Sequence, residues 1–158
     1  MLEAFSGICL ITQVTPMKSK KLRILRQQAS LKQNHRCYYC HFPMWDSDCE
    51  YFSLIHKIPL RLARYLKCTA EHLVARQDGG RDNVGNIAAA CIWCNKMRHY
   101  HREHKAPDAA TYCRRVSQLI SLGRWHPIAA SKCIHMHGFP PNVLMARRIC
   151  ADGAGIHL

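Results

Sequence analysis

The chain has 158 residues, of which 23 are Lys or Arg and 10 are Asp or Glu, so its formal net charge is +13 with His neutral. Its 48% hydrophobic content is enough to bury a core and excludes wholesale disorder. No stretch approaches the roughly 18 apolar residues of a membrane span, which excludes an integral membrane protein. The mildly apolar stretch 5–14 lacks a preceding basic residue, so we expect no secretory signal and a cytoplasmic, reducing location.

In chain order, residues 1–17 are a lead of unassigned role, and residues 18–36 form a basic arm. The arm carries cations with no acid among them: Lys18, Lys20, Lys21, Arg23, Arg26, Lys32 and Arg36. Residues 18–33 lack Gly and Pro, and their apolar residues are expected near one side of a basic helix: Leu22, Leu25, Ala29 and Leu31. The charge favours a polyanionic partner, because Lys and Arg release counterions when they bind phosphates. The alternatives are a solvated arm and, less favoured, an anionic membrane surface.

Residues 37–104 hold the most readable part of the sequence. An apolar and basic insert at 42–66, interrupted by Pro43 and Pro59, has no predictable structure. After it, the pattern predicts a strand over 68–75, a turn over 77–83, a shorter strand over 84–90 and a helix over 91–104. The predicted order is therefore strand, loop, strand, helix.

Residues 105–158 are expected to form a helical extension. The tripeptide at 106–108 predicts a helix start, and Gly123 predicts its end. Apolar residues recur between them at helical spacing and predict a core-facing side: Tyr112, Val116, Leu119 and Ile120. The remainder should contain a turn at 140–142 and one more short basic helix.

Ten cysteines without an export signal favour metal binding over disulfides. Two pairs have C-x-x-C spacing, Cys37 with Cys40 and Cys91 with Cys94, and this spacing lets both sulfurs of a pair face one ion. Four thiolates suit tetrahedral zinc, so we predict one structural zinc; the alternative is two unrelated pairs of free thiols. Five of the six other cysteines are expected to be small buried apolar groups: Cys9, Cys49, Cys68, Cys113 and Cys150.

A pattern connects the two pairs: Cys37-x-x-Cys40, Glu71-His72-Leu73-Val74, Gly79-Gly80, Asn86-Ile87 and Cys91-x-x-Cys94-Asn95-Lys96. Each piece is weak alone, but their order and spacing together are specific. In this pattern, residues 37–98 resemble the HNH endonuclease family in its four-cysteine, zinc-bound form. The resemblance implies an α+β fold in which a small ββα-metal (His-Me finger) core is held by a zinc on four cysteines and flanked by basic α-helices.

The resemblance also implies a reaction, the metal-dependent hydrolysis of phosphodiester bonds in DNA to leave a 5′-phosphate and a 3′-hydroxyl, with RNA not excluded. His72 would be the general base, since imidazole accepts a proton near neutral pH. Glu71 and Asn95 would offer oxygen ligands to Mg²⁺ or Mn²⁺. Asn86 would hold the loop against the catalytic strand. His99, four residues after Asn95 on one helical face, would be a further ligand.

Two of these positions depart from the commoner family residues. Asn95 stands where His is commoner, and Glu71 stands where Asp is frequent, which leaves the preferred metal open. Glu71 and His72 are also adjacent on a predicted strand, where neighbouring side chains point to opposite faces unless the strand bends.

Nucleic-acid contacts are expected from cations beside this site. Lys96, Arg98 and Arg102 should point outward from the predicted helix, with Arg36 nearby; simple solvation is the alternative for them. The competing function is a non-catalytic zinc module that binds nucleic acid through charge alone. A third interpretation is an interaction protein built on the C-terminal helices, residues 112–158.

Overall fold

An antiparallel β-hairpin lies at the centre of the structure, a computed structural model that describes residues 17–100 and 106–130. Strand β1 (Cys68–His72) pairs with β2 (Ile87–Cys91), and the register places Cys68 opposite Cys91 and His72 opposite Ile87. Both strands were predicted, but each is shorter than expected. β1 ends at His72, and the loop that follows it contains the 3-10 turn η2 (Arg76–Asp78). β2 is buried throughout, and its three consecutive alanines leave room for helices to pack closely.

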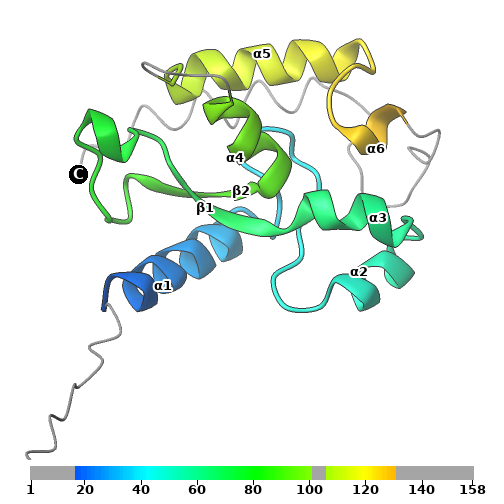
Figure 1. The fold of residues 1–158 in the computed structure, drawn as a ribbon, viewed down its shortest axis with the longest axis horizontal. Helices are drawn as coiled ribbons and strands as arrows, with labels where there is room; N and C mark the ends of the chain where they lie inside the picture. The colour runs from blue at the N-terminus through cyan, green and yellow to red at the C-terminus, as the bar shows by residue number, and fades with distance from the viewer. Residues whose placement is uncertain (1–16, 101–105, 131–158) are drawn as a thin grey trace, which may run out of the picture.

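Helices α1 (Met17–Lys32) and α4 (Ile92–His99) pack against the hairpin, α1 below it and α4 above it in Figure 1. The predicted basic helix is confirmed as α1, in which Leu25 and Ser30 are buried. Leu31 is 64% exposed, so the prediction that it shares the apolar side was wrong. It lies nine residues after Leu22, about two and a half helical turns, and therefore faces the other way.

The unpredicted insert forms helices α2 (Cys49–Ile55) and α3 (Leu60–Ala63), followed by the 3-10 turn η1 (Arg64–Leu66). Asp48 begins α2 by accepting a hydrogen bond from the backbone N–H of Tyr51 at 2.8 Å. Phe52, Leu62 and Leu66 are buried in the core, so the insert is an integral part of the fold.

Helix α5 (Ala109–Ser121) lies above α4 in Figure 1, followed by the short helix α6 (Pro127–Ala130). Asp108 caps α5 by accepting from the Thr111 N–H at 2.9 Å, and Gly123 follows it with a left-handed φ of 64°. Tyr112 and Val116 are buried, as the spacing predicted. The predicted turn at 140–142 and the last basic helix lie outside the described residues.

Together these elements make a small mixed α/β fold, with a two-stranded sheet and a cluster of four cysteines at the end of β2. The α+β expectation is thus confirmed at this level. Among the described helices, none combines the length and the apolar character needed to cross a membrane.

Candidate functional site

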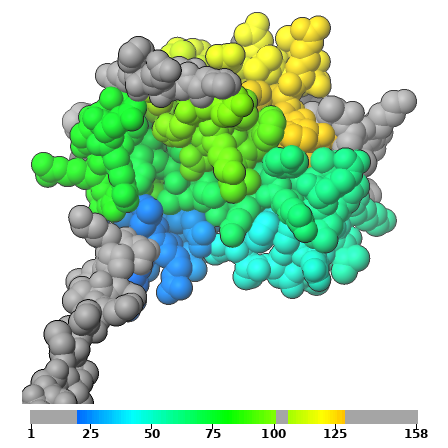
Figure 2. All heavy atoms as spheres, viewed as in Figure 1, coloured from blue at the N-terminus to red at the C-terminus, as the bar shows by residue number. Residues whose placement is uncertain are grey.

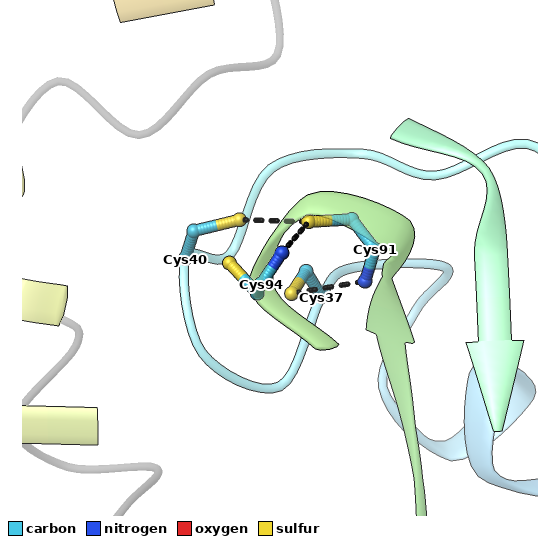
Figure 3. Close-up of side chains that lie close together, drawn as sticks. All are labelled: Cys37, Cys40, Cys91 and Cys94. Carbon is cyan, nitrogen blue, oxygen red and sulfur yellow. Dashed lines mark hydrogen bonds between the residues drawn. The ribbon is translucent and has the colours of Figure 1, made fainter. Parts of the chain in front are cut away.

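The four predicted zinc ligands converge on one point. Cys37 and Cys40 belong to the loop after α1, Cys91 ends β2 and Cys94 lies in the first turn of α4. Their sulfurs point toward one another (Figure 3) and lie within 4.8 Å of one another, all buried. The Sγ atoms of Cys40 and Cys91 are 3.8 Å apart. A tetrahedral zinc with Zn–S bonds of about 2.3 Å places its sulfurs about 3.8 Å apart, so the spacing fits such an ion.

The surroundings of the sulfurs also favour thiolates. Backbone N–H groups of Cys91 and Cys94 donate to the Sγ atoms of Cys37 and Cys91 at 3.2 and 3.4 Å, and the Trp125 indole donates to Cys94 Sγ at 3.3 Å. Although burial raises the pKa of Cys37, hydrogen bonds from the other three cysteines hold that pKa well below its usual value. Burial raises the pKa of Cys40, Cys91 and Cys94. A divalent cation would supply the positive charge that these three need to ionise.

Within the described residues, no other group of three or more His, Cys, Asp or Glu side chains is arranged to hold a metal ion. The four cysteines thus form a possible metal-binding site that is consistent with structural zinc. Of the remaining cysteines, Cys68 is buried as predicted and Cys49 is half-buried. Cys113 is buried but disulfide-bonded, so it is more than a packing group. Cys9, Cys133 and Cys150 lie outside the described residues.

A cavity of about 240 Å³ lies between β1, the loop that follows it, and α4. Figure 2 shows this loop and α4 next to each other on one face of the molecule. The cavity is smaller than the roughly 300–1,000 Å³ of sites that enclose organic molecules, and it suits a small group such as a phosphate or a hydrated ion. Its lining contains four of the predicted site residues: Glu71, His72, Asn95 and His99.

Glu71 is held by buried donors. Its side chain is 1% exposed, and its Oε1 atom accepts a hydrogen bond from the Tyr39 hydroxyl at 3.0 Å and an ion-paired hydrogen bond from the Arg98 guanidinium. The Nε2 atom of His99 lies 3.5 Å from the same oxygen. Burial, followed by the charge of Glu71, raises the pKa of Tyr39, so its hydroxyl stays protonated and donates. These donors fix the orientation of the carboxylate.

Arg98 does not point outward, and its prediction as a nucleic-acid contact was wrong. It is 2% exposed and, besides Glu71, donates to the backbone oxygens of His72, Leu73 and Pro107 at 2.7 to 3.0 Å. Position 98 is one helical turn after the buried Cys94, so it faces the hairpin rather than solvent. Arg98 therefore joins α4 to the end of β1 and to the segment before α5.

His72 contacts two residues of the following loop that the sequence did not single out. Its Nε2 atom is 2.7 Å from Asp82 Oδ1 and 3.1 Å from Arg76 Nε, and Arg76 also pairs with Asp82. One nitrogen cannot donate to Asp82 and accept from Arg76 at once. The shorter distance to the charged group favours a proton on Nε2, which leaves Nδ1 as the proton acceptor. The hydrogen bond from His72, with the charge of Arg76, lowers the pKa of Asp82 and keeps it ionised at neutral pH.

The two asparagines differ in their contacts. Asn95 donates through Nδ2 to Thr69 Oγ1 at 3.0 Å and to the Ala70 carbonyl at 3.1 Å. These two contacts identify the nitrogen of the amide, so the other atom, Oδ1, is the one that could bind a cation. Asn86 accepts from the Val74 N–H at 2.8 Å and donates to the Val74 carbonyl at 3.1 Å. Asn86 does not line the cavity; it fastens the loop after β1 to the start of β2.

Although Glu71 and His72 are neighbours on β1, both line the cavity, which lies where the strand ends. Lys96 is exposed on α4, as expected. Arg36 is half-buried and donates to the His41 carbonyl at 3.0 Å, so it supports the cysteine loop. Arg102 lies outside the described residues.

Comparisons with known proteins find no similar family model, no similar curated protein and no similar solved structure. The function proposed for this chain therefore depends on its own residues and their geometry.

Proposed function

We propose that the chain is a metal-dependent endonuclease of the HNH type, with a ββα-metal core, that hydrolyses phosphodiester bonds in DNA; the same chemistry would also accept RNA. The observation that carries this proposal is the meeting of Glu71, His72 and Asn95 in one cavity formed by β1 and α4. The adjoining cysteine cluster would hold a structural zinc, which joins the loop before the hairpin to the start of α4.

The contacts suit the roles that the sequence suggests. Nδ1 of His72 would take the proton of the attacking water. Asp82 would accept a hydrogen bond from the protonated Nε2 and so orient the ring. Glu71 and Asn95 offer oxygen atoms to a hard divalent cation, and His99 would be a further ligand. Mg²⁺ or Mn²⁺ bound there would supply positive charge beside the phosphate. Asn86 would keep the loop that carries Asp82 in place.

Exposed cations on α4 and on the segment before β1 support a nucleic-acid substrate. Lys96 lies on α4 itself. Three further cations are exposed at three-residue intervals, Arg61 in α3, Arg64 in η1 and Lys67 directly after η1, and η1 contacts α4. Figure 2 shows these segments on the same face as the loop after β1. Because the sequence has no acid between Glu50 and Glu71, this surface would attract a phosphate backbone.

The proposal is tested by plasmid cleavage with Mg²⁺ or Mn²⁺, using the native protein and His72→Asn. Loss of a general base lowers the rate about 10²-fold or more, and we expect a loss of that size with unchanged folding. His35→Asn is the matched control, because His35 is an exposed histidine that does not line the cavity. Equal cleavage by His72→Asn and native protein would refute the role of His72.

One observation favours the alternative, a non-catalytic zinc module that binds nucleic acid. Arg98 already neutralises the buried Glu71, as it would if that carboxylate were purely structural. This alternative predicts salt-sensitive binding of DNA by native protein and His72→Asn alike, with no cleavage that depends on a divalent ion.

A further inference from the structure

A tyrosine from the cysteine loop reaches the cavity carboxylate. Tyr39 lies between two candidate metal ligands, Cys37 and Cys40, and is fully buried. Its hydroxyl donates to Glu71 Oε1 at 3.0 Å across 32 positions of the sequence. Metal binding by the two cysteines needs no hydroxyl at position 39, so this contact calls for a reason of its own.

The tyrosine ring has little freedom to move. It packs edge-to-face against Tyr38 at 5.1 Å and against Tyr112 at 4.8 Å between ring centroids. The Tyr112 hydroxyl in turn donates to the backbone oxygen of Cys94 at 2.8 Å. The position of the Tyr39 hydroxyl is therefore set by the cysteine loop and by aromatic side chains packed beside the cluster.

The contact has a consequence for the carboxylate. Arg98 and Tyr39 both donate to Oε1 of Glu71. A guanidinium readily takes both oxygens of a carboxylate in a bidentate pair. Because the Tyr39 hydroxyl also donates to Oε1, Glu71 is held in an orientation in which Arg98 donates to Oε1 alone. The second oxygen, Oε2, is then left for a cation.

We propose that Tyr39 is a positioning residue for Glu71: through it, the cysteine loop sets the affinity of the cavity for a divalent cation. This inference rests on the proposed function, since it takes Glu71 as a ligand. It implies that a disturbance of the cysteine loop weakens cation binding in the cavity while every cavity ligand stays in place.

The test compares Mn²⁺ binding by zinc-loaded native protein, Tyr39→Phe and Tyr112→Phe, measured by isothermal titration calorimetry or electron paramagnetic resonance. Tyr39→Phe keeps the packed ring and removes only the hydroxyl. We expect it to retain its zinc and to bind Mn²⁺ about 10-fold or more weakly, the usual effect of losing a residue that orients a ligand. Tyr112→Phe also loses one buried hydroxyl but none that touches Glu71, and its Mn²⁺ affinity should match that of the native protein.

A second measurement separates positioning from general damage. If Tyr39→Phe acts through cation affinity, its cleavage rate should fall at low Mn²⁺ concentration and recover at saturating Mn²⁺. Native Mn²⁺ affinity in Tyr39→Phe, or equal weakening in Tyr112→Phe, would overturn this inference and leave the proposed function standing. Failure of the native protein to bind Mn²⁺ would overturn both. Mn²⁺ binding that depends on Tyr39, without DNA cleavage, would support the inference and refute the nuclease.

Discussion

The cysteine cluster and the cavity lie close together but are built differently. The cluster consists of four identical side chains, all buried, whose sulfurs face one another. The cavity brings together unlike groups, and its acid and its base already have partners: Glu71 pairs with Arg98, and His72 pairs with Asp82. A cation at the cluster would meet only ligands, whereas a cation in the cavity would meet a carboxylate that an arginine already neutralises.

This difference suggests that the cluster serves the stability of the fold and the cavity serves the proposed reaction. The cluster joins the loop after α1 to β2 and α4, so a metal bound there would stabilise the fold directly. The cavity lies at the end of β1, where an ion pair and contacts with the following loop hold its side chains in place. A cation there would be bound more weakly than a metal at the cluster and would exchange more readily. Three predictions test this division, from the largest expected effect to the smallest.

The largest effect is expected from Cys91→Ser. Structural zinc contributes on the order of 10 kcal/mol or more to folding, comparable to the whole stability of a domain. We therefore expect this variant to lose its zinc and its cooperative thermal transition, as measured by metal analysis and circular dichroism. Cys49→Ser, at a half-buried free cysteine outside the cluster, should keep both. A Cys91→Ser protein with the native Tm would contradict a stabilising role for the cluster.

A smaller loss is expected from Arg98→Met, which leaves the buried Glu71 without its counterion. Removing one partner of a buried pair costs about 3–5 kcal/mol, and urea unfolding would measure this. The double variant Glu71→Gln with Arg98→Met should lose less than the single variant, because neutral glutamine needs no counterion. Lys96→Met, exposed on the same helix, should change stability by less than about 0.5 kcal/mol. Equal effects at Arg98 and Lys96 would rule out a structural role for the buried pair.

The third prediction concerns pH and His126, which packs against Phe42 and Trp93 on the cysteine side of the molecule. Burial lowers the pKa of His126 from 6.5 to about 4. As pH falls through this window the unfolded chain takes up the proton first, so the contribution of His126 is complete above pH 6.5 and is lost toward pH 4.

The expected loss from this group is about 3 kcal/mol. His126→Asn should remove that part of the pH dependence of the unfolding free energy, and Asn tolerates the positive φ of 73° at this position. His35→Asn, at an exposed histidine that also has a positive φ, should keep the native pH dependence. Identical pH profiles for native protein and His126→Asn would show that His126 is not held neutral by burial.

Local sequence patterns predicted the features that are determined by residues close together in the chain. The C-x-x-C spacing identified four residues whose sulfurs do converge, and turn-forming residues marked the loop between the strands. Helices α1 and α5 followed from uninterrupted apolar spacing, although Leu31 was assigned to the wrong side of α1. The insert at 42–66 was not predicted, because its short helices depend on burial of Phe52 and Leu66 against the rest of the fold.

The network of the cavity could not be predicted in the same way, because its contacts join distant positions. Arg98 resembled its exposed basic neighbours, and nothing local shows that it reaches Glu71, 27 positions away. Asp82 lies in a run of turn formers, which explains its presence without reference to His72. Tyr39 fills a variable position of a C-x-x-C motif. The sequence could suggest the side chains proposed to react, but not the partners that orient and neutralise them.

The most direct test of the central claim is the plasmid-cleavage rate of native protein and His72→Asn at equal zinc content, in saturating Mg²⁺ or Mn²⁺. We predict cleavage by the native protein that depends on the added cation and falls about 10²-fold or more in the variant. Equal zinc content shows that the cysteine cluster, and with it the fold, is intact in both. Native protein that binds DNA without cutting it, or a variant that cuts at the native rate, would contradict the claim that the cavity is a hydrolytic site.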